Sequence, residues 1–320
     1  METIEKTLND VEKTFSTPTY APGGAMVREN LLPMVTRLEY RETPIRDRLA
    51  RKPGNGQAAS WNVMTAMGSG NSAFAEGGTP NEDVTTYERR SAIYKELGKT
   101  KIISDRMIAA GRSFTDQEAE QLEVGMREVI QDEETYLITG NTGVSVLQFD
   151  GLDAYITTNV TDDANNALGF RTDLLDTEVA NILNSYGVRP TAIFCSYGMK
   201  RAINQSLAGD VRVNIDSSNT VATGLEVGFY QSMVGKLPII ATPGISDDSG
   251  TYPGNTVSNI YVVTEKAQGQ DCIYFEDLYP LSKVMLDRTG AAVKFMVTEC
   301  TVLVCRAEEF SSVVQNVRIS

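Results

Sequence analysis

Residues 115–141 read TDQEAEQLEVGMREVIQDEETYLITGN and predict one long amphipathic helix over Thr115–Ile138. Thr115 followed by Glu118 has the pattern of a capping box, in which the two side chains satisfy free backbone amides of the first helical turn. Gly140 predicts a left-handed stop. At about 1.5 Å per residue the helix is roughly 35 Å long. We expect the rest of the chain to be organised around it.

The predicted helix has an apolar stripe and a charged side. Gly125 lies inside it and indicates either a close neighbour or a bend, because glycine costs helix stability. The stripe consists of Leu122, Met126, Val129, Ile130 and Leu137, and the charged side of Glu123, Arg127, Glu128, Asp132 and Glu134.

The composition is that of a globular protein large enough for a sizeable core, with 320 residues of which 41% are hydrophobic. No apolar run approaches the roughly 20 residues of a membrane helix, and the first residues lack the pattern of a cleaved secretion signal. We therefore expect no membrane partner. The cysteines show no CxxC spacing and predict reduced thiols in the core; they are Cys195, Cys272, Cys300 and Cys305.

The chain contains no histidine and has a formal net charge of -13. The absence of histidine removes the commonest general base and the commonest metal ligand. The acidic balance argues against a dedicated nucleic-acid binder, which would need clustered lysine and arginine. We assign no catalytic, cofactor-binding or metal-binding residue and expect no enzyme activity.

A long hairpin is predicted before the helix. Residues 57–66 alternate like a strand, residues 85–94 form the return strand, and the polar, glycine-rich residues between them cannot bury themselves. A two-stranded ribbon is marginally stable alone, so we expect it to lie on another subunit. The single tryptophan should then be partly exposed in an isolated subunit. The expected inter-subunit contacts are Trp61, Val63, Met64, Phe74, Glu76, Tyr87, Arg89 and Arg90.

After the helix, helices and strands alternate, which predicts an α/β lobe. A helix ending at Gly187 and a strand at 191–195 open this lobe, and residues 272–275 are expected to be a strand of the same sheet. The C-terminal residues predict a long hairpin whose sheet packs on the helix stripe. The face expected to contact the stripe carries Met296, Cys300, Val302 and Val304.

Three segments carry a family resemblance: EETYLITGN at 133–141, FDGL at 149–152 and TECTVLV at 298–304. Together with the order of elements, they resemble the major capsid proteins of tailed phages, which have the Hong Kong 97-type capsid fold. The resemblance implies an α+β chain with an arm, an extended loop, a peripheral domain and an α/β axial domain. The implied boundaries are 1–50 for the arm, 51–95 for the extended loop hairpin, 96–148 for the peripheral domain with spine helix 115–138, 149–280 for the axial domain, and 281–320 for the return strands of the peripheral domain.

The resemblance also implies a function. Copies of the chain would form hexamers and pentamers of an icosahedral shell that encloses double-stranded DNA without sequence-specific binding. A portal and separate scaffolding or decoration proteins would be partners, and the virion capsid would be assembled in the host cytoplasm. Some relatives join neighbours through a lysine near the tip of the extended loop. No lysine lies between Lys52 and Lys95, so this cross-link is not implied here.

Two other functions compete with the viral shell. Encapsulin nanocompartments resemble the same fold, and the arm rich in proline and glycine, where an encapsulin usually has a helix, favours the virus. A carboxylate-dependent enzyme is the third possibility. Its candidate residues are more simply interpreted as solvated faces or loops, and they are Asp132, Glu133, Glu134, Asp162, Asp163, Asp247 and Asp248.

Overall fold

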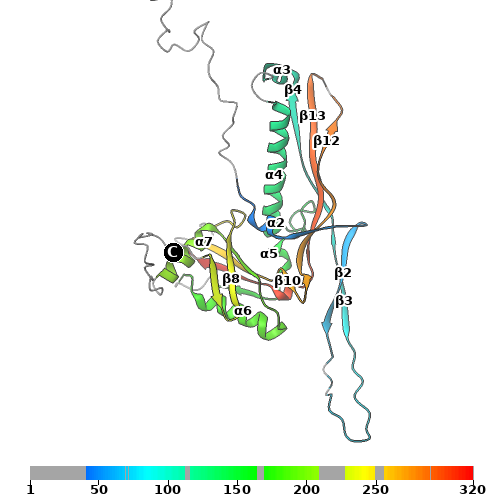
Figure 1. Ribbon diagram of the computed structural model, residues 1–320, viewed down its shortest axis with the longest axis vertical. Coiled ribbons are helices and arrows are strands. Elements are labelled where there is room, and N and C mark those ends of the chain that lie inside the picture. The colour runs from blue at the N-terminus through cyan, green and yellow to red at the C-terminus, as the bar shows by residue number, and fades with distance from the viewer. Residues whose placement is uncertain are drawn as a thin grey trace, which may run out of the picture. The chain divides into compact units, whose positions relative to one another are not determined.

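The structure is a computed structural model in which residues 40–320 form one compact unit (Figure 1). The predicted arm lies outside the described residues except for its last ten positions. The described residues are 41–68, 70, 72–111, 116–163, 169–208, 228–248, 256–288 and 290–319, with the side chains of 207 and 208 left out.

The long helix is confirmed as α4, Gln117–Thr139. Asp116 caps it by accepting hydrogen bonds from the amides of Glu118 and Ala119, at 3.0 and 3.3 Å; the predicted cap, Thr115, lies outside the described residues. The predicted left-handed stop is wrong. Gly140 has φ -58° and ψ 136°, so the chain leaves the helix in an extended conformation.

Close approach of backbone explains why a glycine ends α4. A Cβ built on Gly140 would lie 2.3 Å from the carbonyl oxygen of Phe149 and 2.4 Å from that of Tyr136. A Cβ on Gly151 would meet three carbonyl oxygens of the last helical turn within 2.8 Å. The Gly151 N–H donates a hydrogen bond to the Gly140 carbonyl oxygen at 2.8 Å. The chain therefore passes directly across the open end of α4.

Helix α4 packs on a four-stranded sheet in the order β1-β12-β13-β4, as Figure 1 shows. The hairpin β12–β13 and its packing against α4 confirm the prediction for the C-terminal hairpin. The helix α3, Asp105–Gly111, connects β4 toward α4. The strands are β1 (Ala50–Pro53), β12 (Ile273–Leu286), β13 (Ala292–Cys305) and β4 (Lys95–Ser104).

The face of β13 that contacts α4 differs from the expected one. Val293, Phe295 and Val297 are buried, and a Cβ on Gly125 would be 3.3 Å from the Val297 Cγ2 atom, so this glycine admits a close neighbour. Met296 lies on the other face and is half-buried. The expectation failed because Cys300 to Cys305 are buried on both faces, which hides the alternation in that half of the strand.

The predicted hairpin is confirmed as an antiparallel ribbon of β2, Ala58–Ala66, and β3, Thr86–Ile93. Its register places Trp61 opposite Arg90 and Met64 opposite Tyr87.

The α/β lobe contains a six-stranded sheet in the order β5-β14-β9-β6-β8-β7. Helix α6, Thr172–Tyr186, ends at Gly187 in the predicted left-handed conformation, with φ 68°. Two expectations are wrong: β14, Ser312–Arg318, belongs to this sheet and not to the peripheral one, whereas residues 273–275 belong to β12. The other elements are β5 (Val160–Asp162), β6 (Ala192–Cys195), β7 (Phe229–Ser232), β8 (Gly235–Ala241), β9 (Val257–Val263), α7 (Tyr197–Ala208), α2 (Pro44–Arg48), α5 (Leu152–Tyr155), β10 (Lys266–Ala267), β11 (Gln270–Asp271) and a 3-10 helix (Glu308–Phe310).

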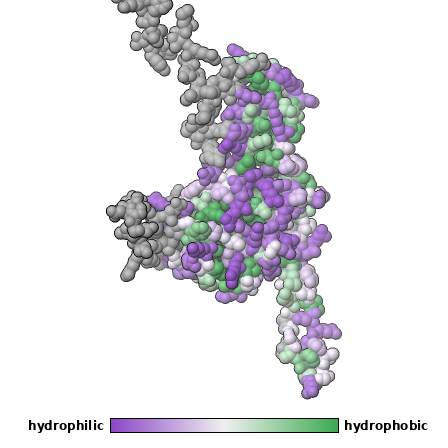
Figure 2. Space-filling model, in the orientation of Figure 1, coloured by the Kyte–Doolittle hydropathy of each residue, from purple (hydrophilic) through white to green (hydrophobic). Residues whose placement is uncertain are grey.

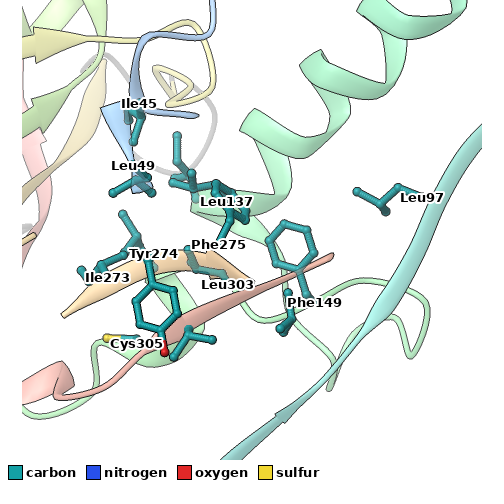
Figure 3. Close-up of a cluster of buried hydrophobic side chains, with 14 of the residues drawn as sticks. Ile45, Leu49, Leu97, Leu137, Phe149, Ile273, Tyr274, Phe275, Leu303 and Cys305 are labelled. Atoms are coloured by element: carbon teal, nitrogen blue, oxygen red, sulfur yellow. The ribbon is translucent and has the colours of Figure 1, made fainter. Parts of the chain in front are cut away.

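Two clusters of buried apolar side chains hold the unit together. The larger lies between the C-terminal end of α4, α2 and the start of the β12–β13 hairpin, where Leu137, Phe149 and Phe275 meet (Figure 3). The smaller lies under α6 and α7. All four cysteines are buried and free, as predicted for core thiols. Within the described part of the chain, no helix has the length and hydropathy of a membrane span.

We predict that Gly140→Ala lowers the free energy of unfolding by on the order of 3 kcal/mol, because the added methyl group must displace backbone. Thermal or denaturant unfolding of the full chain measures this. Gly228→Ala is the matched control, since a Cβ there meets no atom within 4 Å and the residue has no positive φ. Equal stability of the two variants would contradict the role given to Gly140.

Candidate assembly surfaces

The ribbon β2–β3 exposes large apolar side chains beyond its base. Met67 is 74% exposed and Val84 is 78% exposed, and Met64, Phe74 and Tyr87 are exposed as well. Figure 2 shows hydrophobic residues along this extension. The charged residues of the sequence from 53 to 88 are all acidic: Glu76, Glu82, Asp83 and Glu88. The ribbon beyond its base is therefore apolar and acidic, and Arg89 and Arg90 follow nearer the base in β3.

The base of the ribbon is fixed in the core of its own subunit. Trp61 is 7% exposed, and its Nε1–H donates a hydrogen bond to the Arg306 carbonyl oxygen at 3.1 Å. Arg90 donates to Glu309 at 2.6 Å. The expectation that Trp61 is partly exposed in an isolated subunit is wrong, because residues following β13 cover the indole ring. Of the other predicted contact residues, Val63 is half-buried, and Arg89 in β3 and Glu76 near the tip are exposed.

A second surface is the outer sheet face, which we define as the face of β4, β12 and β13 turned away from α4. Cross-strand registers place Leu286, Lys294 and Ile102 in one row and Val284, Met296 and Thr100 in the next. Ile102 is 64% exposed. The outer sheet face consists of Glu96, Gly98, Thr100, Ile102, Ser104, Ser282, Val284, Leu286, Ala292, Lys294, Met296 and Thr298.

Charges on these strands point toward the helix rather than away from it. Lys99 pairs with Asp132 at 2.7 Å, Lys101 pairs with Glu128 at 2.6 Å, and Lys283 pairs with Glu118 of α4. In the usual half-buried sheet the solvent face is the polar one. The outer sheet face carries Lys294 and, at the start of β4 opposite Cys300, the exposed Glu96. The helix-facing side carries the other lysines of these strands. An exposed face of this composition is typical of a surface that becomes covered.

The acidic residues at the end of α4 are not a solvated face. Glu133 and Glu134 are buried, which corrects both the enzyme candidate and the placement of Glu134 on the charged side of the helix. Glu134 accepts hydrogen bonds from the amides of Ile45 (3.3 Å) and Arg46 (2.8 Å) and from the hydroxyl of Thr242 (2.7 Å). Burial raises the pKa of Glu134. This carboxylate joins α2, α4 and the end of β8.

The other acidic pairs lie apart from this junction in contacts of their own. Asp162 accepts from Asn316 at 2.9 Å, Asp163 lies 3.7 Å from Arg171, and the backbone of Asp248 bridges to Val257. Within the described ranges, no group of three or more cysteine or acidic side chains is arranged to hold a metal ion.

The sequence matches the family described as SU10 major capsid protein over residues 6–318. The chain belongs to this family of major capsid proteins. No curated protein matches it at a significant level. The family match of this capsid protein thus agrees with the resemblance to phage capsid proteins that the sequence segments indicated.

Solved structures show that the capsid protein has the Hong Kong 97-type fold. The capsid of cyanophage A-1(L) is 13% identical with a TM-score of 0.68, and the two chains are covered to 91% and 97%. The capsid of Myoviridae phage XM1 is 11% identical with a TM-score of 0.62, covering 92% and 100%. The SrpI encapsulin complex from Synechococcus elongatus PCC 7942 is 16% identical with a TM-score of 0.63, covering 91% and 94%.

Burial of Trp61 in the capsid protein predicts fluorescence at short wavelength and weak quenching by acrylamide in the free subunit, with little change on assembly. Trp61→Ala should lower the free energy of unfolding by about 3–5 kcal/mol, because it removes a large buried ring. Tyr87→Ala, in the same ribbon but 67% exposed, is the control and should change stability by less than about 0.5 kcal/mol. A quenchable tryptophan in the free subunit would show that the ring is not buried.

Proposed function

We propose that this major capsid protein assembles head to tail, with the ribbon β2–β3 of one copy lying on the outer sheet face of the next. The observation that carries the proposal is the distribution of charge on β4, β12 and β13: most of the lysines face the helix α4, and the face exposed to solvent has few charges. The exposed apolar side chains of the sheet face, such as Ile102 and Val284, and those of the ribbon are both unfavourable in water, and each surface can remove the other from solvent. In Figure 1 the ribbon runs away from this sheet in its own subunit.

The two surfaces match in size and charge. The ribbon strands have nine and eight residues, or roughly 30 Å at about 3.3 Å per residue, and β4 with ten residues has a similar length. Sheets pack face to face through interdigitating apolar side chains about 10 Å apart. The face carries one cation, Lys294, and one acid, Glu96, while the ribbon has an acidic tip and the exposed Arg89 near its base, so each surface offers an opposite charge to the other.

A head-to-tail contact uses different patches on each copy, so it forms a closed ring when the rotation between copies divides a full turn. We propose that such rings are the hexamers and pentamers of an icosahedral shell. The ribbon is then the extended loop, α4 with the four-stranded sheet the peripheral domain, and the α/β lobe the axial domain. With a net charge of -13, the shell would enclose double-stranded DNA by confinement rather than through tight, sequence-specific contacts.

Further partners follow from a viral shell. A portal and separate scaffolding or decoration proteins would act with the chain, and assembly would take place in the host cytoplasm. An encapsulin-type compartment is the second candidate because the SrpI encapsulin has the same fold. The match of residues 6–318 to a phage capsid family favours the virus. Electron micrographs of particles with portal or tail vertices would support the viral shell, and closed cages holding a protein cargo would support the compartment.

Two variants test the proposed contact. Ile102→Glu places a charge on the outer sheet face, and deletion of Gly68–Pro80 removes the tip of the ribbon. Each change should block capsomer formation when the variant is alone, because burying an unpaired carboxylate or losing the tip weakens every contact in the ring. A 1:1 mixture should form a dimer and nothing larger, since one intact ribbon and one intact face remain. Analytical ultracentrifugation measures the species.

The control is Val160→Glu, which places a charge at a similarly exposed apolar position of the six-stranded sheet and should leave assembly intact. Capsomers formed by Ile102→Glu alone would show that the ribbon docks elsewhere. Capsomers formed by both variants would overturn the head-to-tail proposal. A wild-type chain that stays monomeric at high concentration, with and without crowding agents, would overturn the assembly itself.

A further inference from the structure

Glu299 is a buried acid without an evident structural role. It lies in β13 on the face turned toward α4 and is 1% exposed. Neither of its carboxylate oxygens has a hydrogen-bond partner among the described residues. A carboxylate in this situation would leave its charge unsolvated and unpaired, which is strongly unfavourable. The side chain therefore needs a ligand that neutralises it.

A second buried carboxylate, Glu133 of α4, affects the acidity of Glu299. Glu133 is 0% exposed, and its negative charge, after burial, is the main cause that raises the pKa of Glu299. Two arginines hold Glu133: Arg46 of α2 through its Nε atom, and Arg51 of β1 through a terminal guanidinium nitrogen. The spine helix is thus tied through one carboxylate to both elements of residues 44–53.

The remaining charged groups around Glu299 come from α2 and β12. Asp277 of β12 accepts from Arg51 at 3.0 Å and from the Thr301 hydroxyl at 2.7 Å. Asp47 of α2 lies 3.4 Å from Arg46, but its side chain is 69% exposed and solvated. Glu134, the next residue of α4, is satisfied separately by two amides and the Thr242 hydroxyl.

The charges of the enclosed cluster do not balance when every group is ionised. Glu133, Asp277 and Glu299 carry three negative charges, and Arg46 and Arg51 carry two positive ones. One added proton makes the cluster neutral. Because Asp277 and Glu133 already accept hydrogen bonds from arginine, the proton belongs on the acid pair at the Glu299 side.

We propose that Glu133 and Glu299 form a proton-binding pair, and that the bound proton keeps residues 44–53 clamped to α4. With the proton on Glu299, both arginines are free to bind Glu133 and Asp277. When Glu299 is ionised, it competes for the same two guanidinium groups and repels Glu133. The clamp on α2 and β1 is then weakened. This inference concerns the fold of one chain and is independent of how copies assemble.

The direction of the pH effect follows from the shift in acidity. Burial, followed by repulsion from Glu133, raises the pKa of Glu299 from 4.5 to about 7. The folded chain therefore holds a proton that the unfolded chain loses at lower pH. The stabilisation by the proton is complete below about pH 4.5 and is lost above about pH 7. Between these values the unfolding constant rises by up to tenfold per pH unit.

Residues 44–53 are where this loss should be seen first. Helix α2 has five residues and β1 has four, and β1 pairs with β12 alone among the described strands. Such short elements have little stability of their own and depend on the contacts with α4. The same segment links the first 40 residues of the sequence to the rest of the chain. The proton thus controls how firmly residues 44–53 are held against α4.

Hydrogen exchange tests the clamp on the full chain between pH 5.5 and 8.5, with rates corrected for intrinsic exchange. In the wild type, protection of amides in 44–53 should fall as pH rises from 5.5 to about 7, by as much as tenfold per pH unit, and should level off above pH 7. Glu299→Gln is neutral at every pH and keeps the size and shape of the side chain. Its protection over 44–53 should be independent of pH and, at pH 8, higher than that of the wild type.

Asp47→Asn is the control, because it removes a carboxylate of α2 whose side chain is 69% exposed and which lies outside the pair. It should retain the wild-type fall in protection of 44–53 with rising pH. The same pH dependence in wild type and Glu299→Gln would overturn the proposal. Should Glu299→Gln not fold, carbon-13 NMR of the glutamate carboxyl groups in Glu134→Gln decides instead, because this variant lacks the other glutamate whose pKa burial raises: a carboxyl titrating near 7 supports the pair, and none above about 5.5 contradicts it.

Discussion

The packing of α4 against the helix-facing side of the four-stranded sheet is the contact on which the rest of the unit depends. It buries Val129 and Leu137 of the helix with Phe295 and Val297 of β13. Gly125 permits the close approach, and lysines of the sheet pair with acids of the helix along the same contact. Because the helix satisfies these charges on one side, the other side of the sheet is left nearly uncharged. The surface that we propose for assembly is thus a consequence of how the core is built.

Periodicity alone predicted the elements that have one buried face. The spine helix, the ribbon and the hairpin β12–β13 were found because apolar residues recur there at 3.6 or 2 positions. The same reasoning failed where both faces are buried, as from Cys300 to Cys305, and where a polar residue enters the core, as at Glu133. No local pattern separates a buried glutamate from an exposed one; its partners, Arg46 and Arg51, are more than 80 residues away.

Pairing between strands that are far apart in the chain also could not be predicted from the sequence. The segment at 312–318 alternates like any edge strand, and its place between β5 and β9 depends on contacts of long sequence separation. Trp61 shows the same limit, since its cover comes from Arg306. The family resemblance supplied the architecture, but neither the identity of the contacting faces nor the burial of single residues. The outer sheet face and the acid pair were visible only after the strand registers were known.

The anchoring of the ribbon has a mechanical consequence. Trp61 is bonded to the carbonyl of Arg306, the Arg306 amide is bonded to the oxygen of Cys272, and Arg90 is tied to Glu309. Both strands of the ribbon are therefore bonded at their base to residues that follow β13. Tension between neighbouring copies would pass from the ribbon into the paired ends of β12 and β13, which lie in the larger apolar cluster. Load would thus be carried by the buried core of each subunit.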